Sequence, residues 1–310
     1  MSSSNLPTTS LRSGLIASFA AYLCWGFFPL YWRLLSEADS TEVIAHRVIW
    51  SAIILGAYFL SAKERRAGLM RDILRLAQQP FLTALLIAAA ATAALNWWIN
   101  VHAAAVGRVT ELGIGMFLTP LLSVLFGCIF YGERFTRTRL TAFGLAATGV
   151  AILATGSGAI PWYAIGVSTT WAAYGAMKKR ITLSPWTSNL VESLLLAPAA
   201  LLFAGSLVIN GTAGFSPDHP GLALALVGTG AVTLVPMLLF AYAAQVLPLY
   251  TLGFCQFLNP ILTILVGCLL MGEVYREEFT LPLALIGVAV VIFVYSETKV
   301  ARASTVNKVA

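Results

Sequence analysis

Charged residues are scarce in this sequence. Only 10% of its 310 residues are Asp, Glu, Lys or Arg, whereas 59% are hydrophobic. A soluble domain carries about 25% charged residues, so this chain has too little polar surface to cover a single core in water. The composition excludes an ordinary soluble protein and predicts an all-α integral membrane protein.

Several chemical motifs are also missing. The sequence has no G-x-x-x-x-G-K-[ST] phosphate loop, which excludes direct use of ATP. No His, Cys and Asp residues have metal-ligand spacing, and the four cysteines fall inside apolar runs, where they are small packing residues. We therefore expect no metal and no cofactor. Strand-like alternation is absent as well, and this favours helices.

Ten apolar runs are long enough to cross a bilayer, which takes about 20 residues each. Backbone polar groups in lipid must be satisfied within their own segment, so these runs are predicted to be helices. The predicted spans are 14–35, 41–62, 81–103, 110–131, 138–156, 161–180, 186–208, 221–245, 249–271 and 280–297. Residues 1–13 are predicted to be a disordered cytoplasmic tail and residues 299–310 a second cytoplasmic tail.

The positions of the basic residues predict the orientation. Of 19 Lys and Arg residues, 15 fall on the side of the N-terminus, whereas only Arg108 and Arg276 fall on the other side. Arg33 and Arg47 lie within spans. Cytoplasmic loops are rich in Lys and Arg, so both termini are expected in the cytoplasm. Loops near lipid head groups account for the net charge of +6, and we expect no nucleic-acid partner.

Two segments have nearly the same sequence: LTPLLSVLFGCIFYGE (118–133) and LNPILTILVGCLLMGE (258–273). At a fixed offset of 140, residues 112–133 match 252–273 at 11 of 22 positions without a gap. Chance resemblance between apolar helices accounts for shared leucines. It does not account for a Pro, three Gly, a Cys and a Glu in register.

The two copies are the fourth and ninth predicted spans, so the repeat unit is five helices. We predict one five-helix repeat over 14–156 and a second over 157–298. Since five is odd, the second repeat enters the membrane inverted. Inverted repeats are typical of secondary transporters, whose site lies between the halves near the midplane. The sequence therefore predicts alternating access to a central site.

Longer motifs carry a resemblance to a known family. They are AAYLCWGFFPLYWRLL, EVIAHRVIWS, NWWINVHAAAVGRVTELGIG, YGAMKKRI and VTLVPMLLFAYAAQVLPLYTLGFCQFLNP, together with the "GE" that closes the fourth and ninth spans. From residue 14 to about 297, the chain resembles the EamA branch of the drug/metabolite transporter superfamily. The resemblance implies a ten-helix permease of small organic molecules in the bacterial inner membrane.

Charged groups within spans are candidates for function, because each costs about 2.5–3.5 kcal/mol at the centre of a helix in lipid. Arg47 offers a planar fork suited to anionic groups, and His46 titrates near neutral pH. The alternative is a snorkelling Arg beside a structural His. Glu192 is either a proton carrier or the counter-ion of Arg47.

Polar and aromatic side chains extend the candidate site. The predicted substrate-binding residues are Arg47, His46, Trp25, Tyr22, Trp50, Asn96, Trp97, Asn100, Tyr174, Gln256 and Asn259. The candidates for proton coupling are His46, Glu192 and His102. Pro120 and Pro260 are predicted to kink their helices and serve gating. Glu133 and Glu273 are expected to order loops by pairing with Arg137 and Arg276.

These observations favour a secondary active or facilitative transporter, without enzymatic activity. Its partners would be a small-molecule substrate, membrane lipids and, where transport is coupled, protons; it would be a monomer or homodimer. The rival hypothesis is a membrane enzyme acting on a lipid-soluble substrate, with His46, His102 and Glu192 as acid/base groups. Alternating access needs an inverted repeat and an enzyme does not.

The charge count yields a topology prediction. Cysteine introduced at Ser216 is expected to react with a membrane-impermeant thiol reagent in intact cells, because the 209–220 loop is predicted to be periplasmic. Cysteine introduced at Ser304 is expected to stay unlabelled until the cells are opened. The opposite labelling pattern would contradict cytoplasmic termini.

Overall fold

The computed structural model describes residues 8–155, 160–275 and 277–306. Every regular element in these ranges is a helix, which confirms the all-α membrane fold. The elements are α1 (Thr8–Gly26), α2 (Phe28–Trp32), η2 (Arg33–Leu35), α3 (Ser40–Leu60), α4 (Lys63–Gln78), α5 (Pro80–Ala105), α6 (Val109–Tyr131), α7 (Arg137–Thr155), α8 (Trp162–Arg180), α9 (Pro185–Ile209), α10 (Pro220–Val246), α11 (Leu249–Gln256), α12 (Leu258–Leu270), η3 (Glu277–Phe279) and α13 (Thr280–Val306).

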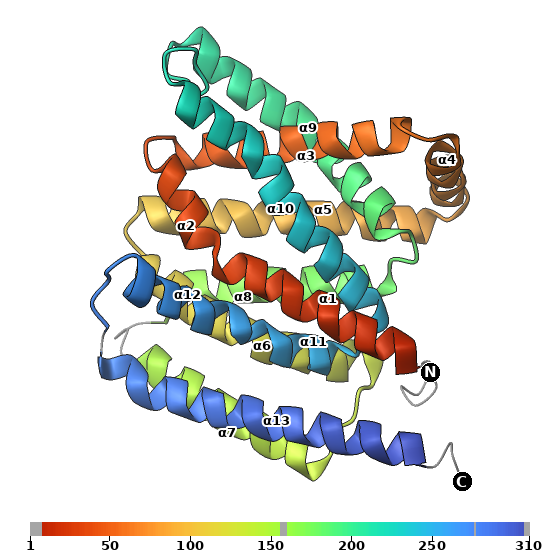
Figure 1. Ribbon diagram of the computed structural model, residues 1–310, viewed down its shortest axis with the longest axis vertical. Coiled ribbons are helices and arrows are strands. Elements are labelled where there is room, and N and C mark those ends of the chain that lie inside the picture. The colour runs from red at the N-terminus through yellow and green to blue at the C-terminus, as the bar shows by residue number, and fades with distance from the viewer. Residues whose placement is uncertain (1–7, 156–159, 276, 307–310) are drawn as a thin grey trace.

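Nine helical segments of the described residues are long and apolar enough to cross a membrane. The remaining predicted span, the sixth (161–180), forms α8, whose last turn carries Lys178, Lys179 and Arg180. α8 packs against α5, α6 and α10 and lies between α5 and α6 in Figure 1. Because protein rather than lipid surrounds much of α8, it can be less apolar than its neighbours.

The ends of the chain differ from the prediction. α1 begins at Thr8, so residues 8–13, which were predicted to belong to a disordered tail, are helical. α13 continues to Val306, well past the predicted end of the last span. Residues 1–7 and 307–310, and the predicted repeat boundary at 156 and 157, lie outside the described residues.

One helix was not expected at all. The basic segment after the second span forms α4, which has no buried residue and exposes the apolar side chains Met70, Ile73 and Leu74. The helix also carries five basic residues against two acidic ones. A helix with this division of side chains is suited to lie in the membrane interface.

Two predicted spans are interrupted. The first breaks at Phe27, two residues before Pro29, and the ninth breaks at Phe257, three residues before Pro260. Proline lacks an N–H and removes the helical bond to the carbonyl four residues earlier, which weakens the helix there. α6 contains Pro120 and nevertheless continues without interruption. A break therefore accompanies Pro260 but not Pro120.

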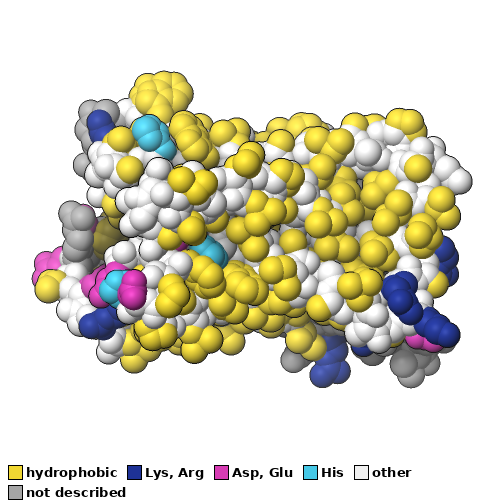
Figure 2. Space-filling view, turned by 90° about the horizontal axis from the view of Figure 1, so that it is seen from above, with side chains coloured by type: hydrophobic (Ala, Val, Ile, Leu, Met, Phe, Trp, Pro, Cys, Tyr) yellow, Lys and Arg dark blue, Asp and Glu magenta, His cyan; other side chains and the backbone are white. Residues whose placement is uncertain are grey.

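The helices run between two ends of the molecule. The start of α1, the end of α13 and α4 all lie at the right of Figure 1, which we call the termini end. The loop between η2 and α3 lies at the opposite, far end. In Figure 2, Lys and Arg gather mainly at the termini end, and most visible Asp and Glu lie at the far end, with a broad apolar surface between them.

α6 and α11 lie side by side and run antiparallel. The Glu133 carboxylate follows α6 and accepts hydrogen bonds from the amides of Leu249 (2.8 Å) and Tyr250 (2.9 Å), which begin α11. The end of one helix therefore meets the start of the other. This is the arrangement expected of two inverted copies.

The two copies also end in the same local structure. Gly132 and Gly272 both adopt positive φ, at 62° and 75°, as helix-terminating glycines commonly do. In each copy, the amide of the following Glu bonds to a carbonyl six residues earlier, at 3.1 Å in the first and 3.0 Å in the second. The repeated sequence therefore specifies a repeated turn.

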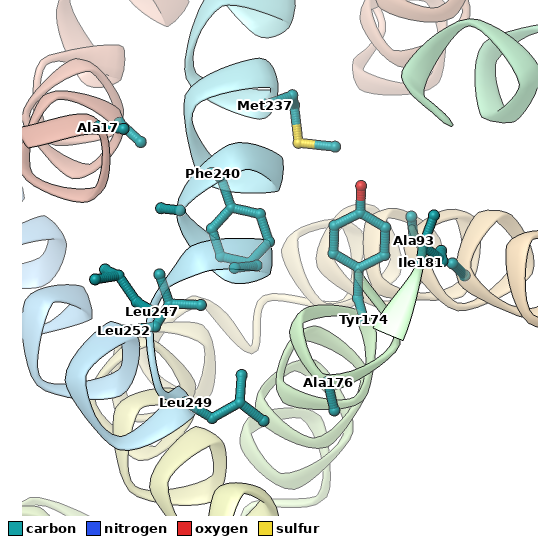
Figure 3. Packing of buried hydrophobic residues seen from close by; sticks show 14 of the residues in the cluster. Ala17, Ala93, Tyr174, Ala176, Ile181, Met237, Phe240, Leu247, Leu249 and Leu252 are labelled. Carbon is teal, nitrogen blue, oxygen red and sulfur yellow. The ribbon is translucent and has the colours of Figure 1, made fainter. Parts of the chain in front are cut away.

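A large apolar cluster fills the middle of the bundle toward the termini end. Figure 3 shows Phe240 of α10 and Tyr174 of α8 facing one another, and their rings stack at 5.9 Å. Leu247 and Leu249, from the α10–α11 turn, belong to the same cluster. This packing closes the interior at that end.

Close helix contacts yield a prediction on stability. A Cβ at Gly230 of α10 would lie 2.7 Å from the carbonyl carbon of Trp50 in α3, whereas a Cβ at Gly205 of α9 meets nothing within 4 Å. Gly230→Val is expected to destabilise the protein by about 1–3 kcal/mol more than Gly205→Val, because it forces α3 and α10 apart. Thermal unfolding in detergent measures the difference, and equal melting temperatures would contradict this contact.

Candidate functional site

A cavity of about 540 Å³ lies among the helices. Its inner wall includes Tyr22 and Met237, which also belong to the apolar cluster described above. Its lining extends to Ser36 and Ala38 in the η2–α3 loop, and to Ala104 near the end of α5. The cavity therefore runs from mid-bundle to the far end, and apolar packing separates it from the termini end.

Most of the predicted substrate-binding residues meet in this cavity. Its lining includes Tyr22, Trp25, Arg47, Asn96, Trp97, Asn100, Gln256 and Asn259. The structure places the predicted residues His46, Trp50 and Tyr174, and also His102 and Glu192, outside the lining. Each of these side chains instead contacts other parts of the bundle.

Among the described residues that line the cavity, Arg47 carries the full charge. Its Nε donates to the hydroxyl of Thr233 at 2.8 Å. The guanidinium carbon lies 5.3 Å from the ring centre of Trp32 and 5.0 Å from that of Trp97. Two indole faces therefore hold the planar group, and such contacts stabilise a desolvated cation.

Aromatic rings form the apolar wall. Trp25 of α1 and Trp171 of α8 meet edge to face at 5.5 Å, and both contact Phe240 of α10. Trp171, Trp32 and Phe28 were not among the predicted site residues. Sequence alone does not separate an aromatic ring that faces a cavity from one that faces lipid.

Amides position and extend the polar side of the cavity. Asn96 Nδ2 donates to the carbonyl of Val167 at 2.8 Å, and Asn100 Nδ2 donates to the carbonyl of Asn96 at 2.8 Å. Gln256 Oε1 accepts from Ser123 at 2.9 Å. These bonds leave part of the polar surface free to face a ligand.

Three buried polar atoms in the cavity wall lack a well-formed hydrogen bond among the described residues. They are Gln256 Nε2, Asn259 Oδ1 and the hydroxyl of Tyr22. Gln256 and Tyr22 lie close together, and each is under 5% exposed. Buried polar groups are ordinarily satisfied, so these atoms mark a place where a ligand or water completes the bonding.

His46 belongs to a structural network rather than to the cavity. Its Nδ1 accepts from Trp50 Nε1 at 3.1 Å, and its ring packs on Phe215 at 4.9 Å. Glu42, which is 1% exposed, accepts hydrogen bonds from the amides of Gly214 and Phe215, each at 3.0 Å. Together these residues fasten the loop between α9 and α10 to α3.

Glu192 is not the counter-ion of Arg47. Its carboxylate accepts from Lys178 Nζ at 2.6 Å and from the Tyr174 hydroxyl at 2.9 Å. Lys178 also donates to Ser188 at 2.9 Å and is fully buried. Lys178 is one of the 15 basic residues that the charge count places on the cytoplasmic side. A basic run at the end of a span does not reveal which of its members turns inward.

A second, much smaller cavity of about 30 Å³ lies between Arg47 and Glu192, and Thr233 and Asn189 also line it. This volume is large enough to hold a water molecule. The buried Lys178–Glu192 pair is therefore separated from the Arg47 guanidinium only by this small cavity.

His102, another candidate for proton coupling, stacks on Trp98, and their ring centres lie 5.0 Å apart.

The loop glutamates differ from expectation. Besides the α11 amides, Glu133 approaches Lys179 Nζ at 3.7 Å, and the expected pairing with Arg137 is not formed. Lys179 in turn donates to the carbonyl of Leu247 at 2.5 Å. The charge of Glu133 thus serves the α10–α11 turn. The expected partner of Glu273, Arg276, lies outside the described residues.

Comparison with known proteins finds one family over nearly the whole chain. The sequence matches the EamA-like transporter family over residues 12–155 and again over 159–296. It is 34% identical over 293 residues to protein RarD of Streptomyces exfoliatus, covering 94% of this chain and 91% of that protein. Identity to protein RarD of Escherichia coli K12 is 32% over 283 residues, covering 91% and 94%.

The chain is also similar to a further named relative and to a protein of known structure. A Pseudomonas aeruginosa relative named chloramphenicol-sensitive protein RarD is 29% identical over 290 residues, covering 93% of this chain and 96% of that protein. A solved crystal structure of a protein 17% identical in sequence superposes with a TM-score of 0.69 and covers 93% of this chain and 99% of that chain. At this identity, the superposition shows the fold alone.

The buried ion pair generates a prediction. Lys178→Met leaves the Glu192 charge buried without its partner, so it is expected to cost about 3–5 kcal/mol of stability. The double variant Lys178→Met/Glu192→Leu is expected to regain most of that loss. Arg75→Met, which removes an exposed partner of Asp72, is the control and should cost under about 1 kcal/mol. Thermal unfolding of detergent-purified protein measures all three; a harmless Lys178→Met would contradict the pairing.

Proposed function

Because the chain belongs to the EamA-like transporter family, we propose that it carries small organic molecules across the bacterial inner membrane by alternating access. The family and the names of its relatives identify a membrane transporter rather than an enzyme. The central cavity is the proposed substrate site. In the described state, it opens toward the far end, which the excess of Lys and Arg on the other side predicts to be periplasmic.

Unequal packing of the two repeat copies carries this proposal. Gly253 of α11 lies against α6, where a Cβ would come within 2.8 Å of both the Pro120 carbonyl oxygen and Val124. Its counterpart at an offset of 140 is Gly113 in α6, where a Cβ would meet nothing within 4 Å. The same residue in the same repeat motif is therefore tightly packed in one copy and open in the other.

The glutamates of the two copies are equally asymmetric. Glu133 holds the start of α11 and closes the termini end. Its counterpart Glu273 would, by the repeat, hold the start of α6 at Val109 and Thr110. A transporter with inverted repeats changes state by exchanging the arrangements of its halves. In the opposite state, Glu273 would close the far end while Glu133 releases α11.

The broken and continuous helices fit the same exchange. α6 continues through Pro120, whereas its counterpart divides into α11 and α12 ahead of Pro260. In the proposed opposite state, α11 and α12 would align and α6 would bend. Hinges of this kind absorb the change of backbone angles between two states.

The driving force is either the substrate gradient or protons. For protons, the Lys178–Glu192 pair is the strongest candidate, since both groups are buried and a small polar cavity links Glu192 to Arg47. The name of the Pseudomonas aeruginosa relative adds drug-sized compounds to the substrates that deserve testing.

Gly113→Val tests the exchange of states. The variant is expected to fold normally, because space surrounds Gly113 in the described state, yet to lose transport at least tenfold, because α12 can no longer close against it. Gly144→Val in α7, which also meets nothing within 4 Å, is the matched control and should transport normally. Counterflow in proteoliposomes with a metabolite library measures transport, and full activity of Gly113→Val would contradict the proposal.

Gly253→Val is expected to act in the opposite direction, because it disfavours the packing seen at the termini end. A cysteine introduced at Ala38, in the wall of the cavity mouth, reports the state without knowledge of the substrate. Its labelling by an external thiol reagent should fall in Gly253→Val and stay high in Gly113→Val. Identical labelling of the two variants would argue against a conformational exchange.

A further inference from the structure

We propose that the central cavity selects organic anions, namely small molecules that carry a carboxylate or an equivalent negative group on a flat apolar body. The inference rests on the proposed transport function and names the substrate class of that site. Its basis is an uncompensated positive charge in an aromatic enclosure.

The charged residues around the cavity leave Arg47 without a carboxylate partner among the described residues. Among the described residues that line the cavity, Arg47 is the only one with a full charge. The nearby carboxylates are already engaged: Glu42 holds two loop amides and lies 3.9 Å from His46, and Glu192 pairs with Lys178. No described carboxylate lies within ion-pair distance of Arg47. Its positive charge is therefore directed to the cavity contents.

The hydrogen-bonding capacity of Arg47 supports the same assignment. A guanidinium presents five N–H donors, and the described residues accept one hydrogen bond from it, at Thr233. Trp32 and Trp97 cover the group without accepting the remaining bonds in its plane. A carboxylate matches this planar fork with two parallel hydrogen bonds.

The rest of the cavity suits the body of such a molecule. Trp25 and Trp171 provide flat apolar surface on which a ring can pack. Beyond them, Gln256 Nε2 and the Tyr22 hydroxyl are buried beside each other, and because neither has a well-formed hydrogen bond among the described residues, both can turn to a polar substituent. A volume of about 540 Å³ lies within the range of small-molecule sites.

Other substrate charges fit less well. A cation would be repelled by Arg47, and a neutral molecule would displace water while leaving the guanidinium without a counter-ion in a largely apolar enclosure. Burying an unpaired charge is costly. An anion removes that penalty, so binding favours it over its neutral analogue.

The charge of the cavity can be measured without knowing the substrate. The design uses a background with all four native cysteines replaced and one cysteine introduced at Ala104, which lines the cavity. Rates of modification by 2-sulfonatoethyl and 2-trimethylammonioethyl methanethiosulfonate are each divided by the rate with free 2-mercaptoethanol. The anionic reagent is expected to be favoured roughly tenfold, because an uncompensated positive charge in the same cavity attracts it.

Substitution of Arg47 decides whether that preference comes from the cavity. Arg47→Gln should abolish it, whereas Arg33→Gln should change it less than twofold, since exposed Arg33 does not line the cavity. A preference for the anionic reagent that survives Arg47→Gln, or no preference in the parent protein, would overturn the anion assignment.

Transport of matched pairs completes the test. Counterflow in proteoliposomes compares 4-nitrobenzoate with 4-nitrobenzamide, and indole-3-acetate with indole-3-acetamide. The acids should exchange at least tenfold faster than the amides, and Arg47→Lys, which loses the planar fork, should reduce that selectivity. Equal transport of acid and amide would refute anion selectivity while leaving transport intact. If no compound shows counterflow, either in these pairs or in the metabolite library, the result would count against the transport function itself. The ratio of the modification rates of the anionic and cationic reagents at Ala104 would then decide the anion assignment independently.

Discussion

The carboxylate of Glu133, set against the first amides of α11, is the interaction on which the arrangement of this protein depends. The N-terminal amides of any helix have no intrahelical partner, and α11 begins inside the bundle, where water cannot freely supply one. A carboxylate satisfies them and also complements the positive end of the helix dipole. Because Glu133 directly follows α6, this local requirement joins the two repeat copies at the termini end. The cavity is left to open at the other end.

Buried carboxylates accept hydrogen bonds from backbone amides at two other places in the bundle. Glu111, 8% exposed, accepts from the amide of Tyr163 at the start of α8, as Glu42 does from the amides of the α9–α10 loop. In a chain with 13 acidic residues, several of the buried carboxylates are thus committed to backbone amides. Glu192 is committed to Lys178. The scarcity of free acidic groups is the reason that Arg47 keeps an unpaired charge.

The large features of the fold could be predicted from sequence because their signals are long or periodic. Apolar runs specify the spans, a fixed offset of 140 reveals the duplicated helix, and an arginine in an apolar run marks the cavity. Features that depend on which face of a helix meets protein could not be predicted. Lys178 and Lys179 are adjacent, yet one is buried against Glu192 and the other reaches the α10–α11 turn. His46 and Arg47 are likewise adjacent, and only Arg47 lines the cavity.

Which conformational state the protein adopts could not be predicted from the sequence, because the two copies of the repeated motif have the same residues but lie in different surroundings. A glycine inside a helix costs about 1 kcal/mol relative to alanine, and at Gly253 the close approach of α6 explains it. At Gly113 the described state provides no such contact, so the glycine has a cost there without a visible benefit. The benefit becomes intelligible if α12 packs against Gly113 in another state, as α6 packs against Gly253 in this one. A glycine without a close contact in one conformation is then needed for helix packing in the other. Because one sequence must allow both conformations, a single structure will contain glycines whose contacts it does not show.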